Sequence, residues 1–107
     1  MEAVFVQAGH IVNHTPTTAL AAGQVVVLGE LVAVATYPVE ANQTCGLAVQ
    51  GVFDFAKGST AIALGALVYW DDAANIATTT ATGNKLIGKV IRAAAASDSR
   101  VRVLLTP

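Results

Sequence analysis

Hydrophobic and β-branched residues occur along this chain in short runs separated by turn residues, a pattern typical of strands rather than helices. The clearest run, residues 67–70, lies between a glycine and two adjacent aspartates and predicts a buried strand. Residues 76–80 form a second run of small and β-branched residues. These runs predict a β-meander within residues 61–90.

Three further segments have the composition of strands. Residues 24–28 are mostly valine, and residues 47–55 are apolar around Gly51, where a bulge or a close backbone contact is expected. Residues 100–105 alternate, which places two arginines outward and three aliphatic side chains inward. No segment is long enough for a stable helix, so we expect at most one short helical turn.

Two parts of the chain resemble each other. Residues 18–26 match residues 60–68 without a gap, at an offset of 42 residues. A turn, a small strand and an apolar strand with a glycine follow each copy. The sequence therefore predicts an all-β fold, a small barrel or sandwich built from two similar β-units. We expect residues 1–9 to form an N-terminal arm or an edge strand, and residues 10–107 to form a single β domain.

The composition favours association with a partner. The chain is 54% hydrophobic and 12% charged, with a mean hydropathy of +0.60, whereas ordinary soluble domains are roughly 25% charged. So much apolar surface suits an oligomer or a bound partner, although abundant Ala also raises the hydrophobic count. No tract is long enough to cross a membrane, and residues 1–5 lack the start of a signal peptide, so no membrane partner is expected.

The patterns that carry catalysis or metal binding are incomplete. His10 and His14 share one face of an extended segment, but no third ligand accompanies them. Residues 83–90 fit the phosphate-loop pattern except at Val90, where Ser or Thr is required, and a strand rather than a helix follows. The lone Cys45 indicates a buried thiol in a reducing compartment. We therefore expect no enzymatic activity, no metal and no cofactor.

Charge is distributed unevenly along the chain. Residues 85–107 carry five of the six basic groups and one acid, whereas residues 1–84 carry the other basic group and six acids. Aromatic residues do not interleave with the basic ones. This pattern indicates a solvated face or a contact with an acidic protein surface, and we expect no nucleic-acid partner.

Several short motifs, in this order and spacing, resemble the small capsid cement (decoration) proteins of tailed phages. They are Phe5-Val6-Gln7-x-Gly9, Gly23-x-Val25, Gln50-Gly51-Val52-Phe53 followed by Lys57, Gly65-x-Leu67-Val68-Tyr69-Trp70-Asp71, Thr78-Thr79-Thr80, Leu86-Ile87-Gly88 and Val101-Arg102-Val103. Members of that family have sometimes been mislabelled RecA/RadA recombinases, and the failed phosphate-loop pattern argues against such a label here.

The resemblance implies a β-rich structural virion protein. It would be made in the bacterial host cytoplasm, bind the outside of a phage or prophage capsid through the major capsid protein, and stabilise the head, commonly as a homotrimer. The alternative function is a non-catalytic ligand- or carbohydrate-binding β-module on a virion surface, which needs exposed aromatic side chains.

Two sets of residues are candidates for contacts with partners. An apolar arm is suited to adding a strand to the sheet edge of another protein, so we predict that Ala3, Val4, Phe5, Val6 and Gln7 contact the capsid. Tyr69 and Trp70 are predicted to lie in the core or in an oligomer interface.

Overall fold

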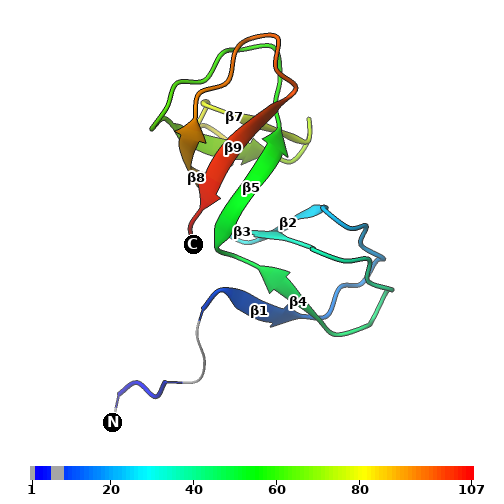
Figure 1. The fold of residues 1–107 in the computed structure, drawn as a ribbon. Coiled ribbons are helices and arrows are strands. Elements are labelled where there is room, and N and C mark those ends of the chain that lie inside the picture. Colours follow the sequence, from blue (N-terminus) through cyan, green and yellow to red (C-terminus); the bar gives the residue numbers. More distant parts are fainter. Residues whose placement is uncertain (1, 6–8) are drawn as a thin grey trace.

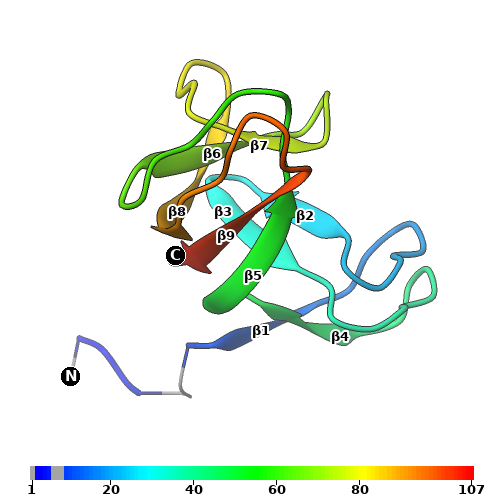
Figure 2. The same ribbon diagram turned by 45° about the horizontal axis from the view of Figure 1, so that its top comes forward.

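The computed structural model describes residues 2–5 and 9–107, and within them it contains two antiparallel sheets packed as a sandwich (Figures 1 and 2). The four-stranded sheet has the order β1-β4-β3-β2, and the five-stranded sheet has the order β5-β9-β8-β6-β7. The strands are β1 Ile11–His14, β2 Val25–Leu28, β3 Leu31–Val34, β4 Cys45–Ala48, β5 Gly51–Ala56, β6 Leu67–Asp71, β7 Ile76–Thr78, β8 Lys85–Arg92 and β9 Arg100–Leu105. The predicted all-β fold is confirmed. No helix in the described residues is long and apolar enough to span a membrane.

The two sheets repeat one arrangement of strands. The order β1-β4-β3-β2 corresponds to β5-β9-β8-β6, with β7 added at the outer edge of β6. The register agrees as well, since the pair Val12 and Leu47 in the first sheet corresponds to the pair Asp54 and Arg102 in the second. The predicted construction from two similar β-units is confirmed, and it extends far beyond the nine residues whose sequences match.

Hydrogen bonds outside the strands repeat in the same way. The amide of Gly23 donates to the carbonyl of Ala35 (2.6 Å), and in the second unit the amide of Gly65 donates to the carbonyl of Val90 (2.7 Å). Both glycines have φ near 81°, a left-handed conformation that favours glycine. The offset is 42 residues between the donors but 55 between the acceptors. The second unit therefore contains 13 extra residues before β8, and these include β7.

Two sequence predictions about connections are wrong. Residues 47–55 do not form one strand, because the chain leaves the four-stranded sheet after β4 and enters the five-stranded sheet at Gly51, whose φ of 139° suits only glycine. The predicted meander is absent because β7 and β8 pair with opposite edges of β6. Both errors concern long-range pairing, which local residue patterns do not encode.

The core has two parts. The larger part lies between the sheets, where Val32 and Val34 of β3 pack with Phe55, Trp70 and the inward residues of β8 and β9. The smaller part covers the other face of the four-stranded sheet, where Ala33 and Leu47 meet residues of the connecting loops. Val32, Ala33 and Val34 of β3 are therefore buried on both faces of this sheet, whereas the edge strand β1 stays partly exposed.

Lys57 is a buried charged residue with 7% of its surface exposed. Its Nζ donates hydrogen bonds to the carbonyl oxygens of Gly58 (2.8 Å), Ala95 (3.0 Å) and Asp98 (2.8 Å). An ammonium group has three N–H donors, so all of them are used. These bonds tie the loop after β5 to the loop between β8 and β9.

Gly88 lies where β8 approaches the backbone of β9 too closely for a side chain. A Cβ atom at this position would overlap the carbonyl oxygen of Leu104 and lie 3.1 Å from its carbonyl carbon. Backbone atoms of a neighbouring strand cannot move aside as a side chain can. A larger residue at position 88 would therefore push β8 and β9 apart at the centre of the five-stranded sheet.

We predict that Gly88→Ala lowers the free energy of unfolding by about 2 kcal/mol or more, because the added methyl group forces the backbone of β9 to shift. Urea unfolding followed by tryptophan fluorescence measures the change. Gly9→Ala is the control, since a Cβ there meets nothing within 4 Å, and it should change stability by less than about 0.5 kcal/mol. Equal stability of the two variants would contradict the close approach at Gly88.

We predict that Lys57→Met lowers the free energy of unfolding by about 2 to 4 kcal/mol, because three carbonyl groups lose a charged donor while the aliphatic stem is largely kept. The same urea titration provides the measurement. Lys89→Met makes the same chemical change at an exposed position of β8 and should cost less than about 0.5 kcal/mol. A Lys57→Met protein as stable as its control would show that these three bonds contribute nothing net.

Candidate functional site

The N-terminal arm, residues 2–5, lies away from both sheets (Figures 1 and 2). Val4 is 71% exposed and Phe5 is 85% exposed, and neither belongs to a strand. Ala3 is also exposed, whereas Val6 and Gln7, the other two predicted capsid contacts, fall outside the described residues. The arm thus presents apolar side chains to solvent, and both its capsid contact and its separation from the domain stay predictions.

Tyr69 and Trp70 point to opposite faces of β6. Trp70 is 5% exposed and packs on Phe55 with ring centroids 6.0 Å apart, while its Nε1 donates a hydrogen bond to Asp72 Oδ1 (3.1 Å). Tyr69 is half-buried on the other face, opposite Leu86 of β8. Trp70 therefore belongs to the core, and a binding module that uses its indole ring as an exposed platform loses support.

The outer face of the five-stranded sheet carries a row of exposed side chains. The register places Val52 of β5 opposite Leu104 of β9, Leu104 opposite Lys89 of β8, and Lys89 opposite Leu67 of β6. Val52 is 52% exposed, Leu104 is 39% exposed and Leu67 is 46% exposed. This face is apolar for an exposed sheet surface, with one lysine in the row.

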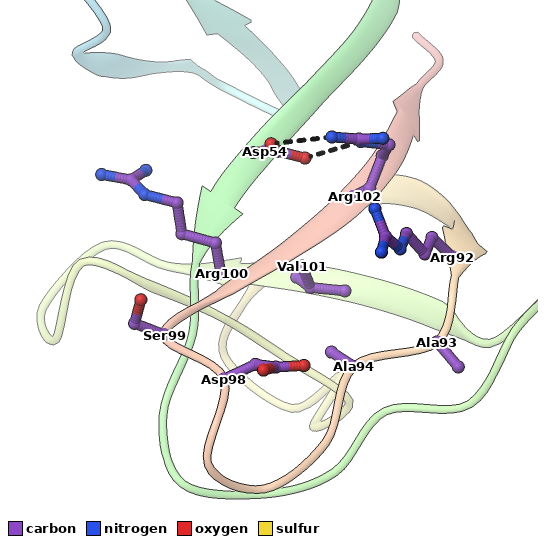
Figure 3. A pocket seen from close by; sticks show the side chains of 9 residues that line it. All are labelled: Asp54, Arg92, Ala93, Ala94, Asp98, Ser99, Arg100, Val101 and Arg102. Carbon is purple, nitrogen blue, oxygen red and sulfur yellow. Dashed lines mark hydrogen bonds and ion pairs between the residues drawn. The ribbon is translucent and has the colours of Figure 1, made fainter.

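A cluster of three arginines, Arg92, Arg100 and Arg102, lies on the same sheet beyond this row and surrounds Asp54 (Figure 3). Arg102 Nε donates to Asp54 Oδ1 at 2.9 Å, and its Nη2 donates to Oδ2 at 3.3 Å, so the pair is bidentate. Figure 3 shows Arg100 and Arg92 on either side of this pair. The arginine cluster lines an open cavity of about 340 Å³.

The arginine cluster contains more positive charges than negative charges paired with them. Asp54 is paired with Arg102, and the carboxylate of Asp98 accepts a hydrogen bond from the amide of Ala95 (2.9 Å). Within the described residues, neither Arg92 nor Arg100 has an ion pair. The hydrogen bond from Arg102 holds the pKa of the Asp54 carboxyl below its ordinary value of 3.8, against the opposing effect of desolvation, and the charges of Arg100 and Arg92 lower it further.

Sequence reasoning located this cluster only in part. Alternation along β9 places Arg100 and Arg102 outward, as predicted, but Arg92 would point inward if β8 were regular. A register shift between Val90 and Arg92 brings Arg92 opposite Arg102 instead. The sequence contains no bulge signal at this point that could have revealed the contact.

The other candidate groups from the sequence include Cys45 and residues 83–90. Cys45 is buried, and the described residues contain no group of three His, Cys, Asp or Glu side chains placed to hold a metal ion. Residues 83–90 form a turn followed by β8. The feature with the strongest potential for binding is therefore the exposed face of the five-stranded sheet with its arginine cluster.

We predict that the Asp54 carboxyl titrates below pH 3.8, because its charged form is hydrogen-bonded to Arg102. The pair therefore stabilises the fold above the ordinary carboxyl pKa, and this contribution is lost as pH falls through the lower value. Carboxyl ¹³C NMR gives the midpoint. In Arg102→Gln the midpoint should rise, whereas Lys85→Gln, which breaks the separate pair with Glu30, should leave it unchanged. A midpoint at or above 3.8 in the unmodified protein would contradict the pairing.

Comparison with known proteins identifies a family. The family model described as phage cement protein matches residues 6–105, nearly the whole chain. No curated protein and no solved structure matches the chain. Because the match includes every strand of both sheets, this chain belongs to the phage cement protein family, whose members are structural proteins of the phage capsid.

Proposed function

We propose that the protein binds the outside of an assembled phage or prophage capsid through the major capsid protein and stabilises the shell as a homotrimer. The observation that carries this proposal is the family match over residues 6–105. In this proposal the protein is made in the bacterial host cytoplasm and acts on the virion surface. It performs no catalysis and requires no cofactor, nucleic acid or membrane.

The fold suits a protein that must resist load. Apolar clusters pack on both faces of the four-stranded sheet, the sheets share a core, and Lys57 links two loops. Such a structure deforms little under load. When the protein binds a shell at several points, its strands and packed side chains therefore carry the tension between those points. A cement protein stabilises a capsid by binding only its assembled form, because ligand binding favours the state that is bound.

The exposed apolar surface supports association with other subunits. Large hydrophobic side chains that are at least 39% exposed occur on the arm, on the edge strand β1, on the five-stranded sheet and in the loops; they are Val4, Phe5, Ile11, Tyr37, Val52, Leu64, Leu67, Leu86, Ile91 and Leu104. Burial of apolar surface of this kind favours association at roughly 25 cal/mol per Å² before the entropic costs are subtracted. A trimer and a shell contact would both use such surface.

The arm is proposed as one capsid contact, made by strand addition. Its backbone in residues 2–5 belongs to neither sheet, and Val4 and Phe5 are its most apolar exposed side chains. An extended segment that joins the edge of another sheet gains main-chain hydrogen bonds, and alternate side chains fill pockets. The contact would thus depend on the arm being free in the unbound protein.

Deletion of Met1 to Gln7 should leave a folded oligomer that no longer binds heads. The reason is that residues 2–5, the part of this segment that the structure describes, belong to neither core cluster. Co-sedimentation with heads assembled without the protein measures binding, and light scattering across a dilution series measures the mass of the oligomer.

The matched control keeps the length of the arm and changes only its apolar character, through the double substitution Val4→Ser and Phe5→Ser. This variant should bind more weakly than the intact protein and retain its circular dichroism spectrum and mass. Full binding by the deleted protein would remove the arm from the capsid contact. A strict monomer at every concentration would remove the trimer as the state of the free protein.

A further inference from the structure

The outer face of the five-stranded sheet has an excess of positive charge beside an apolar row. Lys89, Arg92, Arg100 and Arg102 point from this face or its end, and Asp54 is the carboxylate paired among them. Asp98, which also lines the cavity, has one carboxylate oxygen occupied by the amide of Ala95. The face therefore complements a negatively charged surface.

The arrangement of the arginines favours carboxylates as the ligands. Asp54 already holds Arg102 in a bidentate pair, with 2.9 Å and 3.3 Å between the donor and acceptor atoms. This pair fixes one guanidinium and leaves Arg92 and Arg100 beside it without an ion pair in the described part of the chain. A planar guanidinium binds a carboxylate with two parallel hydrogen bonds, so two further acidic side chains fit here.

The apolar row points to a protein partner rather than to a nucleic acid. Val52, Leu67 and Leu104 are each between 39% and 52% exposed. The pair Val52 and Leu104 lies two residues along from the pair Asp54 and Arg102, and Leu67 lies opposite Lys89. Protein interfaces combine an apolar centre with arginine at or near it. A nucleic-acid backbone would use the arginines but leave these aliphatic side chains in contact with phosphates and sugars.

We propose that this face docks an acidic segment of the capsid shell protein, with its carboxylates on Arg92 and Arg100 and its apolar side chains on Val52, Leu67 and Leu104. The inference rests on the proposed function, since it names a surface through which the capsid is bound. Asp54 acts as a positioning residue: it holds Arg102 and touches no partner group.

The two proposed capsid contacts differ in their response to salt. Strand addition by the arm depends on main-chain hydrogen bonds and apolar contacts, which salt affects little. Exposed ion pairs weaken as salt rises, because the Debye length falls from about 10 Å at 0.1 M to about 3 Å at 1 M. Binding through Arg92 and Arg100 should therefore weaken as salt rises, and replacing these two arginines should remove this salt dependence.

The test measures binding of the full-length protein to heads assembled without it, at salt concentrations from about 50 mM to about 500 mM. The variants are Arg92→Gln, Arg100→Gln and the two together. The double variant should bind at least about tenfold more weakly at low salt and show a smaller salt dependence than the unmodified protein. Circular dichroism and thermal unfolding establish that each variant is folded.

Lys85→Gln is the matched control. It removes one positive charge from β8, but Lys85 reaches Glu30 at the β2–β3 turn (2.7 Å) rather than the arginine cluster. This variant should bind within about twofold of the unmodified protein.

The outcomes separate the docking face from the function. Head binding that is equal in all variants at every salt concentration would overturn the docking face and leave the proposed function in place. Failure of the unmodified protein to bind heads at all would overturn both. Binding of a short DNA duplex that the double substitution abolishes, with head binding unchanged, would identify a phosphate surface and overturn the acidic protein partner.

Discussion

The passage of the chain from β4 to β5 is the constraint on which the two-sheet arrangement depends. β4 ends at Ala48 and β5 begins at Gly51, so two residues separate an interior strand of one sheet from an edge strand of the other. So short a connection fixes where the sheets meet, and β3 then packs against β8 to form the shared core. The left-handed φ of 139° at Gly51 makes this passage possible without steric strain.

The residues that carry the family resemblance mostly specify the fold. Gly51 lets the chain change sheets, Lys57 ties two loops, Trp70 fills the core, and Gly88 lets β8 approach β9. Each has a local physical requirement that few other residue types meet. This explains why short motifs in a fixed order identify the family even though none of them forms a catalytic or ligand-binding pattern.

Local patterns predicted the strands well and their partners poorly. Runs of apolar residues located β2, β6 and β9 because burial between sheets selects β-branched and aliphatic residues. The gapless match covers only residues 18–26, where a tight glycine turn constrains the sequence, and beyond it only the order of turns and strands repeats. Elsewhere the two units share the pairing of their strands but not their residues, because many different sequences can form the same pairing. The candidate site depends on a bulge at β8, so the position of Arg92 could not be predicted from alternation.

The two similar units of the fold have different surroundings, and the proposed docking face follows from this difference. In the four-stranded sheet, β2 and β3 pack against the five-stranded sheet on one face, loops cover much of the other face, and Ile11 of β1 stays exposed. The five-stranded sheet has a core on one face only, so the opposite face carries Val52, Leu67 and Leu104 in contact with solvent. In the proposed docking arrangement, the first unit supports the second unit, which presents the docking face. A basic carboxyl-terminal segment, residues 85–107, then supplies that surface with charge because β8 and β9 lie at its centre.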